Sequence, residues 1–180
     1  MSRLRIPTRD AAPHASRKVL DAVYAKLGVV PNVFRLIGSS PAALGAFATL
    51  HGNLERALDP KTRERISLAV AQCNGSDYCL SAHSYAAMNS AKLGPDEIAL
   101  NREGRSKDAK AEAAVRFAVA VVEQRGRVAD ADVERVRAAG YDDAQIVEIV
   151  ALIAENIFTN YLNEVARTEI DFPPVRSRND

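Results

Sequence analysis

The 180-residue sequence predicts a single all-α domain of seven to eight helices. No stretch alternates apolar and polar residues over five or more positions, as a half-buried strand would. Apolar residues recur instead at intervals of three and four, and capping residues, glycines and prolines divide the segments that carry this pattern. With 47% hydrophobic and 26% charged residues, a chain of this length is expected to build one apolar core.

Caps and helix breakers set the bounds of these helices in chain order. A serine or an aspartate stands before the helices that begin at Pro41 and Pro60, where its side chain can cap the helix and the proline needs no amide partner. Glycines follow the helices that end before Gly28, Gly94 and Gly140. We therefore expect helices at 16–27, 41–58, 60–73, 77–93, 95–100, 111–124, 130–139 and 142–166, with an arm at 1–15 and a tail at 171–180.

Two of these helices show the clearest periodicity. Between 111 and 124 the apolar residues fall three and four positions apart, which predicts a half-buried helix. The same spacing continues from Ile146 to Val165 over about six turns, behind an acidic start at Asp142 and Asp143. We expect this last helix to be central. Because it is apolar over much of its circumference, and short helices cannot all bury their apolar faces in a small monomer, we also expect a homo-oligomer.

Charge and hydropathy argue against several classes of protein. The 24 Lys and Arg residues nearly balance the 23 Asp and Glu residues, leaving a net charge of +1, so we expect neither nucleic acid nor a membrane surface as partner. The longest apolar runs reach six residues, far below the roughly 18 of a membrane-spanning helix. The basic first residues have no apolar segment behind them, as a secretory signal would, and we predict a cytoplasmic protein.

The two cysteines, Cys73 and Cys79, flank the turn of a predicted helical hairpin. Asn74-Gly75 tolerates positive φ and ends the first helix, and Ser76 is a favourable N-cap for the second. Cys79 is then the third helical residue, where free backbone amides and the helix dipole favour a thiolate. In a reducing compartment, two such cysteines are typical of a redox-active site, a metal site or plain core rather than of a structural disulfide.

His83 and Glu64 complete a candidate catalytic site. His83 lies four residues after Cys79, so the two side chains share one helix face and the imidazole is placed to take the thiol proton. Glu64 is ten residues before the turn, about 15 Å along its helix, and His83 is seven residues after Ser76, about 10 Å. Antiparallel packing would bring Glu64 within roughly one turn of His83. The three side chains would then supply a nucleophile, a base and an orienting carboxylate.

This part of the chain resembles a known family. The runs 58–66 and 69–72, followed by Asn74-Gly75-x-x-Tyr78-Cys79-x-x-x-His83, resemble the carboxymuconolactone decarboxylase and alkylhydroperoxidase D (AhpD) superfamily. Its motif is a glutamate, eleven residues, Cys-x-x-Cys, three residues and a histidine. The segments 28–35 and 169–173 resemble the peroxidase-related subgroup, so the resemblance covers nearly the whole chain.

The resemblance implies an AhpD-like helical fold with a catalytic hairpin, assembled as trimers or hexamers. It implies an alkylhydroperoxidase-like antioxidant enzyme without a cofactor, in which Cys79 attacks a hydroperoxide while His83 and Glu64 relay protons. A thioredoxin-like or lipoyl-bearing partner would then recycle the sulfur. Ser76 stands where the family has its resolving cysteine, so Cys79 cannot form the usual disulfide with that position.

Cys73 is the only other thiol and therefore the candidate resolving residue. A bridge from Cys73 to Cys79 needs Cα atoms within about 7 Å, whereas six residues of continuous helix separate them by about 9 Å, so only the turn would permit it. Because Cys73 continues the apolar series of its helix, a small buried core residue is the favoured interpretation. Ser76 is either the natural residue or an engineered replacement.

Several alternatives stay open. Glu64 can also be an exposed partner of a neighbouring basic residue, and His51 is typical of a core or interface histidine rather than of a second catalytic base. Asn156, Asn160 and Asn163 share one helix face, which favours polar contacts between helices or subunits. No metal site is expected, because four suitable ligands are not assembled locally. The alternative functions are a carboxymuconolactone decarboxylase-like lyase, acting without sulfur chemistry, and a non-catalytic, redox-sensing oligomer.

Overall fold

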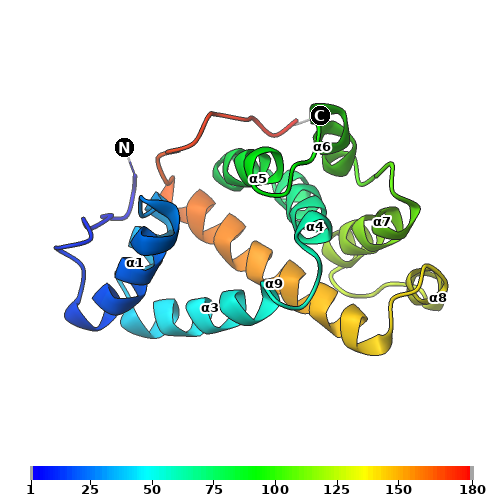
Figure 1. Cartoon of the computed structure of the whole chain (residues 1–180), viewed down its shortest axis with the longest axis horizontal. Coiled ribbons are helices and arrows are strands. Elements are labelled where there is room, and N and C mark those ends of the chain that lie inside the picture. Colours follow the sequence, from blue (N-terminus) through cyan, green and yellow to red (C-terminus); the bar gives the residue numbers. More distant parts are fainter. Residues whose placement is uncertain (1, 179–180) are drawn as a thin grey trace.

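A computed structural model of the chain describes residues 2–178; Met1 and residues 179–180, the last part of the predicted tail, lie outside the described residues. Between residues 2 and 178 the chain forms nine α-helices and no strand, which confirms the all-α prediction (Figure 1). The helices are α1 (His14–Leu27), α2 (Asn32–Ile37), α3 (Pro41–Leu54), α4 (Pro60–Cys73), α5 (Asp77–Asn89), α6 (Pro95–Arg102), α7 (Ala109–Glu123), α8 (Asp130–Ala138) and α9 (Asp143–Ala166). None of them combines the length and the apolar character that a membrane span requires.

The described chain has one helix more than the predicted seven to eight. Helix α2 was not predicted, because six residues are too few to show a helical period and Pro31 at its N-cap makes no side-chain hydrogen bond. Two predicted helices were too long: α3 ends at Leu54 rather than 58, and α5 ends at Asn89 rather than 93. Leu58 and Leu93 are each only 6% exposed, but they pack from non-helical segments. Apolar spacing indicates which residues are buried, not which are helical. Because Leu58 and Leu93 are buried outside the helices, the predicted ends of both helices lay too far along the chain.

The helix at the centre of the fold is α4, so the prediction that the last helix is central was wrong. All residues of α4 from Arg65 to Ala71 are buried, and α4 packs against α5, α6, α7 and α9. The long helix α9 runs diagonally across the molecule (Figure 1) and contacts α3, α4, α5 and α7 along one face. Its other face carries an exposed apolar stripe in which each residue is more than 40% exposed. This stripe consists of Val147, Val150, Phe158, Tyr161 and Val165.

The segment after α9 runs past α5 towards α6 (Figure 1) and is tied to α5 by side chains. The Tyr78 hydroxyl donates to Asp171 Oδ1 at 2.8 Å, and the other oxygen of Asp171 accepts from the backbone N–H of Asn32 at 2.7 Å. Further along, Val175 N donates to the Ser81 hydroxyl oxygen at 2.9 Å. These contacts link the tail, α2 and the N-terminal half of α5, and so hold α5 on the side away from α4.

A buried carboxylate joins α4, α6 and the loop before α7. Glu97 Oε1 accepts hydrogen bonds from Arg65 Nε at 2.8 Å and from Ser106 Oγ at 2.5 Å. Asn101 Nδ2 donates to the same oxygen at 3.1 Å, and Lys107 N donates to Oε2 at 3.0 Å. Burial alone would raise the pKa of Glu97, but these hydrogen bonds outweigh it and lower the pKa to about 2.

We predict that Glu97→Gln lowers the free energy of unfolding by roughly 2–4 kcal/mol at pH 7, because it leaves Arg65 without a charged partner. The folded-state pKa lies below the ordinary 4.5, so this stabilisation is complete above about pH 4.5 and is lost as the pH falls through about 2. Urea unfolding from pH 7 to pH 2 measures both effects. Asp96→Asn, at a neighbouring side chain that is 83% exposed, is the control. A Glu97→Gln variant as stable as the control contradicts the prediction.

Candidate functional site

The α4–α5 hairpin forms as its sequence predicts. Asn74 caps α4 with right-handed helical angles, and Gly75 takes φ +66°, a value that favours glycine. Ser76 has extended angles and occupies the N-cap of α5, but its hydroxyl makes no capping hydrogen bond. The predicted position of Ser76 is therefore right, and the predicted side-chain cap is wrong: the residue is fully buried, but its hydroxyl does not bond the helix amides.

The sulfur of Cys79 is buried at the first turn of α5. The residue is 4% exposed, and Sγ accepts a hydrogen bond from Asn163 Nδ2 on α9 at 3.3 Å. The sequence analysis assigned Asn163 to contacts between helices, which is confirmed, but it did not connect this residue with the sulfur.

His83 and Glu64 are brought together across the hairpin, as the sequence predicts. His83 Nδ1 lies 3.0 Å from Glu64 Oε2, and the two side chains are 26% and 22% exposed. Burial lowers the pKa of His83, but the Glu64 carboxylate outweighs it, with help from the Glu155 charge and a hydrogen bond that the imidazole donates to the side chain of Asn156. The net effect raises the pKa of His83, so the imidazole is well suited to hold a proton taken from a thiol.

Three asparagines of α9 line the inner side of the hairpin. Asn156, Asn160 and Asn163 are all buried. Asn156 Nδ2 donates to Ser67 Oγ on α4 at 3.1 Å, and Asn160 Oδ1 accepts from Asn74 Nδ2 at 2.9 Å. The asparagine contacts therefore follow the hairpin from α4 through its turn to the sulfur on α5. In the sequence, only the helical spacing of these three asparagines indicated that they share the face of α9 that contacts the hairpin.

Cys73 differs from the prediction of a buried core residue. It is exposed, and both cysteines are free thiols. Although Cys73 reaches the surface, partial burial of its sulfur and the nearby Glu123 carboxylate raise the pKa of its thiol to about 11. A thiol with so high a pKa is mostly protonated at neutral pH and is a poor nucleophile.

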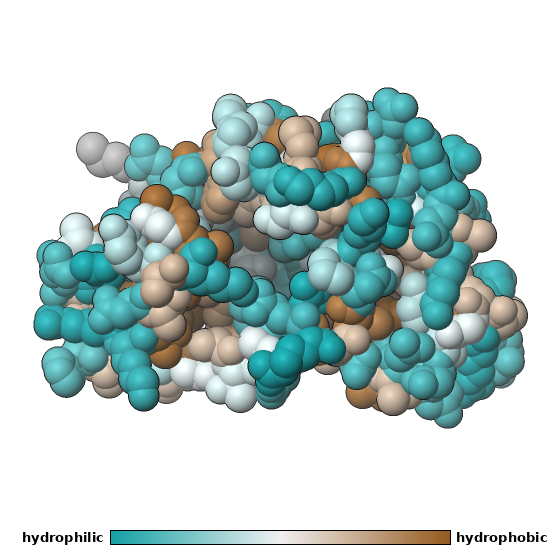
Figure 2. Space-filling model, in the orientation of Figure 1, coloured by the Kyte–Doolittle hydropathy of each residue, from teal (hydrophilic) through white to brown (hydrophobic). Residues whose placement is uncertain are grey.

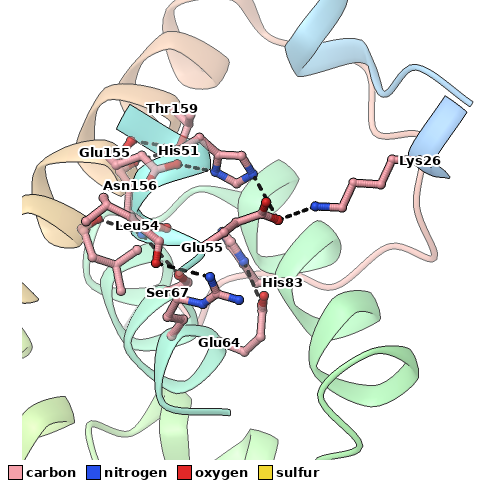
Figure 3. Close-up of polar contacts among 12 residues, drawn as sticks. Lys26, His51, Leu54, Glu55, Glu64, Ser67, His83, Glu155, Asn156 and Thr159 are labelled. Atoms are coloured by element: carbon pink, nitrogen blue, oxygen red, sulfur yellow. Dashed lines mark hydrogen bonds and ion pairs between the residues drawn. The ribbon is translucent and has the colours of Figure 1, made fainter. Parts of the chain in front are cut away.

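A second histidine faces the same region from α3. His51 Nδ1 lies 2.5 Å from Glu155 Oε1, and Glu55 Oε1, which pairs with Lys26 Nζ at 2.5 Å, lies 3.9 Å from His51 Nε2 (Figure 3). The ring is 41% exposed, so His51 is not a core histidine, and the other half of the prediction, an interface histidine, stays a prediction. The molecule is hollowed at the centre of the face in Figure 2, between α1 and α3 on one side and α4 and α5 on the other, and we call this depression the hollow.

Another groove lies away from these residues. It has a volume of about 1270 Å³, is lined mainly by α7 and α8, and contains none of the predicted site residues. Its charged residues largely pair with one another, as Glu112 does with Arg116 and Asp132 with Arg135. The predicted site residues therefore lie around the hollow rather than in this groove.

Comparisons with known proteins agree with this geometry. Residues 41–124, which include the whole hairpin, match the carboxymuconolactone decarboxylase family. An uncharacterized peroxidase-related protein from Ralstonia eutropha JMP134, described as an alkylhydroperoxidase AhpD core, has a similar structure with a TM-score of 0.83 and 28% identity, covering 94% of this chain and 92% of that chain. A peroxidase-related protein from Silicibacter sp. TM1040 gives a TM-score of 0.80 and 26% identity over 97% and 92% of the two chains.

A third similar structure is the debrominase Bmp8 in complex with 2,3,4-tribromopyrrole, with a TM-score of 0.78 and 21% identity over 95% of this chain and 94% of that chain. No curated protein sequence matches the chain. The family match and the two peroxidase-related structures support the predicted resemblance to the carboxymuconolactone decarboxylase and AhpD superfamily.

We predict that Glu64→Gln lowers the pKa of His83, because it removes the carboxylate that favours the imidazolium. The raised pKa of His83 contributes stability that is complete below the ordinary value of 6.5 and is lost as the pH rises through the folded-state value. The variant should therefore lose thermal stability at pH 5–6 and little at pH 9. NMR titration of the His83 ring, assigned with His83→Asn, measures the pKa directly. Glu112→Gln on α7 is the control, and an unchanged His83 titration in Glu64→Gln would remove Glu64 from the site.

Proposed function

We propose that the chain is a thiol-dependent hydroperoxide reductase of the AhpD type. Cys79 is the attacking thiol and His83 is its base. Glu64 orients the imidazole and favours its protonated form. The observation that carries the proposal is the buried sulfur of Cys79 on the first turn of α5, with an N–H donor at 3.3 Å and an imidazole–carboxylate pair one helical turn away. A nucleophile, a base and an orienting carboxylate in this order are typical of an activated thiol.

The reaction proceeds in two steps. His83 takes the proton of the Cys79 thiol, and the thiolate donates an electron pair to the terminal oxygen of a hydroperoxide ROOH. The O–O bond breaks, RO⁻ leaves and takes up a proton, and the sulfur becomes a sulfenic acid. A dithiol then reduces this sulfenic acid to the thiol, releasing water and becoming a disulfide itself.

Two features of the hairpin favour an external reductant. Ser76, in the resolving position, has no sulfur, and Cys73 carries a raised thiol pKa that disfavours its attack on the sulfenic acid. We therefore assign the reducing step to a thioredoxin-like or lipoyl-bearing partner. A cytoplasmic location, where such reductants are kept reduced, remains part of this proposal.

The alternatives are less well supported by the charges of the hollow. The carboxylates around the hollow, from Glu55, Glu64 and Glu155, outnumber the cations Lys26 and Arg63, and this balance disfavours an acidic substrate of the kind that a carboxymuconolactone decarboxylase-like lyase binds. A non-catalytic redox sensor needs neither the His83–Glu64 pair nor the access that the hollow provides. Complete lack of peroxide reduction with every dithiol donor would favour that sensor.

We also propose that the chain forms a homo-oligomer, a trimer or a hexamer. Its accessible surface is 9723 Å², whereas a compact monomer of 19.5 kDa has about 8,500 Å². The excess of about 1,200 Å² is larger than the about 800 Å² per partner that one standard protein–protein interface removes. The exposed apolar stripe of α9 is the surface that this interface is expected to cover.

The first prediction concerns the resolving position. One equivalent of hydroperoxide should convert Cys79 to the sulfenic acid, and excess peroxide should convert it to the sulfinic acid, because no resolving thiol intervenes. Ser76→Cys should raise dithiol-dependent peroxide turnover several-fold, because a reducible disulfide replaces a species that over-oxidises. Mass spectrometry of Cys79 and a coupled peroxide assay measure the two effects.

Matched variants give this test its controls. Ser90→Cys adds a thiol at the exposed C-terminal end of α5 and should leave turnover at the wild-type level. Cys73→Ala should also leave it unchanged, and a loss of activity there would make Cys73 the resolving thiol. If Cys79 resists oxidation by every hydroperoxide, the reductase proposal fails, and 2,3,4-tribromopyrrole, the ligand of the similar debrominase structure, becomes the next electrophile to test.

The second prediction concerns assembly. Light scattering at micromolar concentration should give a particle three or six times the 19.5 kDa of one chain. Val150→Glu combined with Tyr161→Glu places charges in the apolar stripe of α9 and should release monomers. Gln145→Glu, which preserves the capping box at the start of α9, is the control and should stay assembled. A wild-type particle of 19.5 kDa contradicts the proposal.

A further inference from the structure

The side-chain amide of Asn163 contacts the sulfur with one end and leaves its other end without a partner. Asn163 lies on α9 and is 2% exposed, and its Nδ2 donates a hydrogen bond to Cys79 Sγ at 3.3 Å. Its Oδ1 is buried and accepts no hydrogen bond from any residue that the structure describes. Because Nδ2 and Oδ1 belong to one planar amide group, about 2.2 Å apart, this free acceptor lies no more than about 5.5 Å from Sγ.

The surroundings of the sulfur increase the weight of this single amide. Cys79 belongs to a buried apolar cluster that also contains Leu68, Ala71 and Leu80. Within the described chain, Asn163 is the residue that hydrogen-bonds to Sγ. In apolar surroundings a hydrogen bond is stronger than in water, and an unpaired polar atom is correspondingly costly. The chemistry of the amide therefore has a large influence on which group can bind beside the sulfur.

A comparison with Asn156 argues against a purely structural role for Asn163. Asn156, two turns earlier on α9, uses both ends of its amide: Nδ2 donates to Ser67 Oγ at 3.1 Å, and the side chain accepts a hydrogen bond from His83 (Figure 3). Asn163 uses only Nδ2. An apolar residue of the same shape, such as leucine, would fill position 163 without leaving a buried acceptor unpaired. We therefore expect a ligand to complete the hydrogen bonding of Oδ1.

A second unpaired group lies one turn earlier on the same face of α9. Asn160 is fully buried, and its Oδ1 accepts from Asn74 Nδ2 at 2.9 Å, but its Nδ2 has no partner among the residues that the structure describes. Because residues three apart on a helix are neighbours, a free donor and a free acceptor face the hairpin together. A hydroxyl group both donates and accepts hydrogen bonds, whereas a carboxylate cannot donate and an ammonium cannot accept. The pair of asparagines therefore fits a ligand with an O–H group.

We infer that Asn163 is a catalytic residue whose amide binds the sulfur and the terminal hydroxyl of the hydroperoxide side by side, a role that rests on the proposed reductase function. Nδ2 donates to Cys79 Sγ, and Oδ1 accepts from the O–H of ROOH. The oxygen that the sulfur attacks is thereby held next to it. This contact also sets the substrate class. Hydroperoxides and hydrogen peroxide have the required O–H, whereas a dialkyl peroxide has none and would leave Oδ1 unpaired.

The hydrogen bond to Oδ1 survives the reaction. The sulfur donates an electron pair to the terminal oxygen and is oxidised by two electrons, while the O–O bond breaks with its pair on RO⁻. RO⁻ takes up one proton, which balances the proton that the thiol gave to His83. The O–H bond of the attacked oxygen does not break, so it becomes the S–O–H of the sulfenic acid and stays bonded to Asn163 Oδ1. The same amide edge therefore matches both the bound hydroperoxide and the oxidised cysteine.

The test compares two reagents that must reach the same buried sulfur. tert-Butyl hydroperoxide has an O–H for Oδ1, whereas methyl methanethiosulfonate has none and forms a mixed disulfide as methanesulfinate leaves. Asn163→Leu keeps the size of the side chain and removes both ends of the amide. In single-turnover reactions of the full-length protein at pH 7, the hydroperoxide rate divided by the thiosulfonate rate should fall about 30-fold. Mass spectrometry of the Cys79 peptide separates this reaction from that of Cys73. Asn89→Leu, at the exposed end of α5, is the matched control.

Two further variants complete the test. Asn163→Ala also lacks the acceptor, replaces Asn163→Leu if that variant does not fold, and should lower the ratio in the same way. Asn163→Asp keeps an acceptor oxygen and loses the N–H, so its ratio should stay within about 3-fold of the wild-type value. Equal losses with both reagents in Asn163→Leu, no loss with either, or a ratio in Asn163→Asp as low as in Asn163→Leu would overturn the role of Asn163 and leave the reductase proposal intact. A wild-type protein whose Cys79 is not oxidised by tert-butyl hydroperoxide would overturn the reductase function and this inference together.

Discussion

The register between α9 and the α4–α5 hairpin is the constraint on which the site depends. The buried amides of Asn156, Asn160 and Asn163 bond to α4, to the turn and to the sulfur of α5, so a shift of α9 by one residue would break all three contacts. A buried polar group left without a partner costs about 1–3 kcal/mol, so this register is strongly favoured. With it fixed, Glu155 lies beside His51 and acts on His83, and Asn163 lies at the sulfur.

The balance of charge in the hollow follows from the same arrangement. Three carboxylates and two imidazoles face a region that is partly shielded from water, where each charge acts on its neighbours more strongly than at the surface. Glu64 comes from the hairpin and Glu155 from α9, and both favour a protonated His83. A site of this kind is rich in exchangeable protons, and the two nearby cations, Lys26 and Arg63, act on Glu55. It therefore suits an uncharged substrate whose reaction moves protons better than it suits a substrate that must be held by its negative charge.

The parts of the site that the sequence predicts are those encoded within one continuous stretch. Glu64, Cys79 and His83 lie within one hairpin, and helical rise together with an Asn-Gly turn determines how far each stands from the turn. His51 and Glu155 are 104 positions apart and meet only because α3 packs on α9, which no local pattern records. The same limit explains why the last helix, α9, was predicted to be central although α4 occupies the centre of the fold. Apolar spacing shows which faces avoid water, but it does not show whether the same chain or another one covers them.

The burial of the sulfur also bears on how an oxidised Cys79 is reduced. Ser76 offers no sulfur beside it, Cys73 is at the surface with a thiol pKa of about 11, and Cys79 itself is 4% exposed. In the proposed reaction, a reductant must therefore bring its own thiol to a sulfur that is almost fully buried. A dithiol that extends from its carrier reaches such a sulfur more readily than one held flat on a folded surface, whether the carrier is lipoyl-bearing or thioredoxin-like.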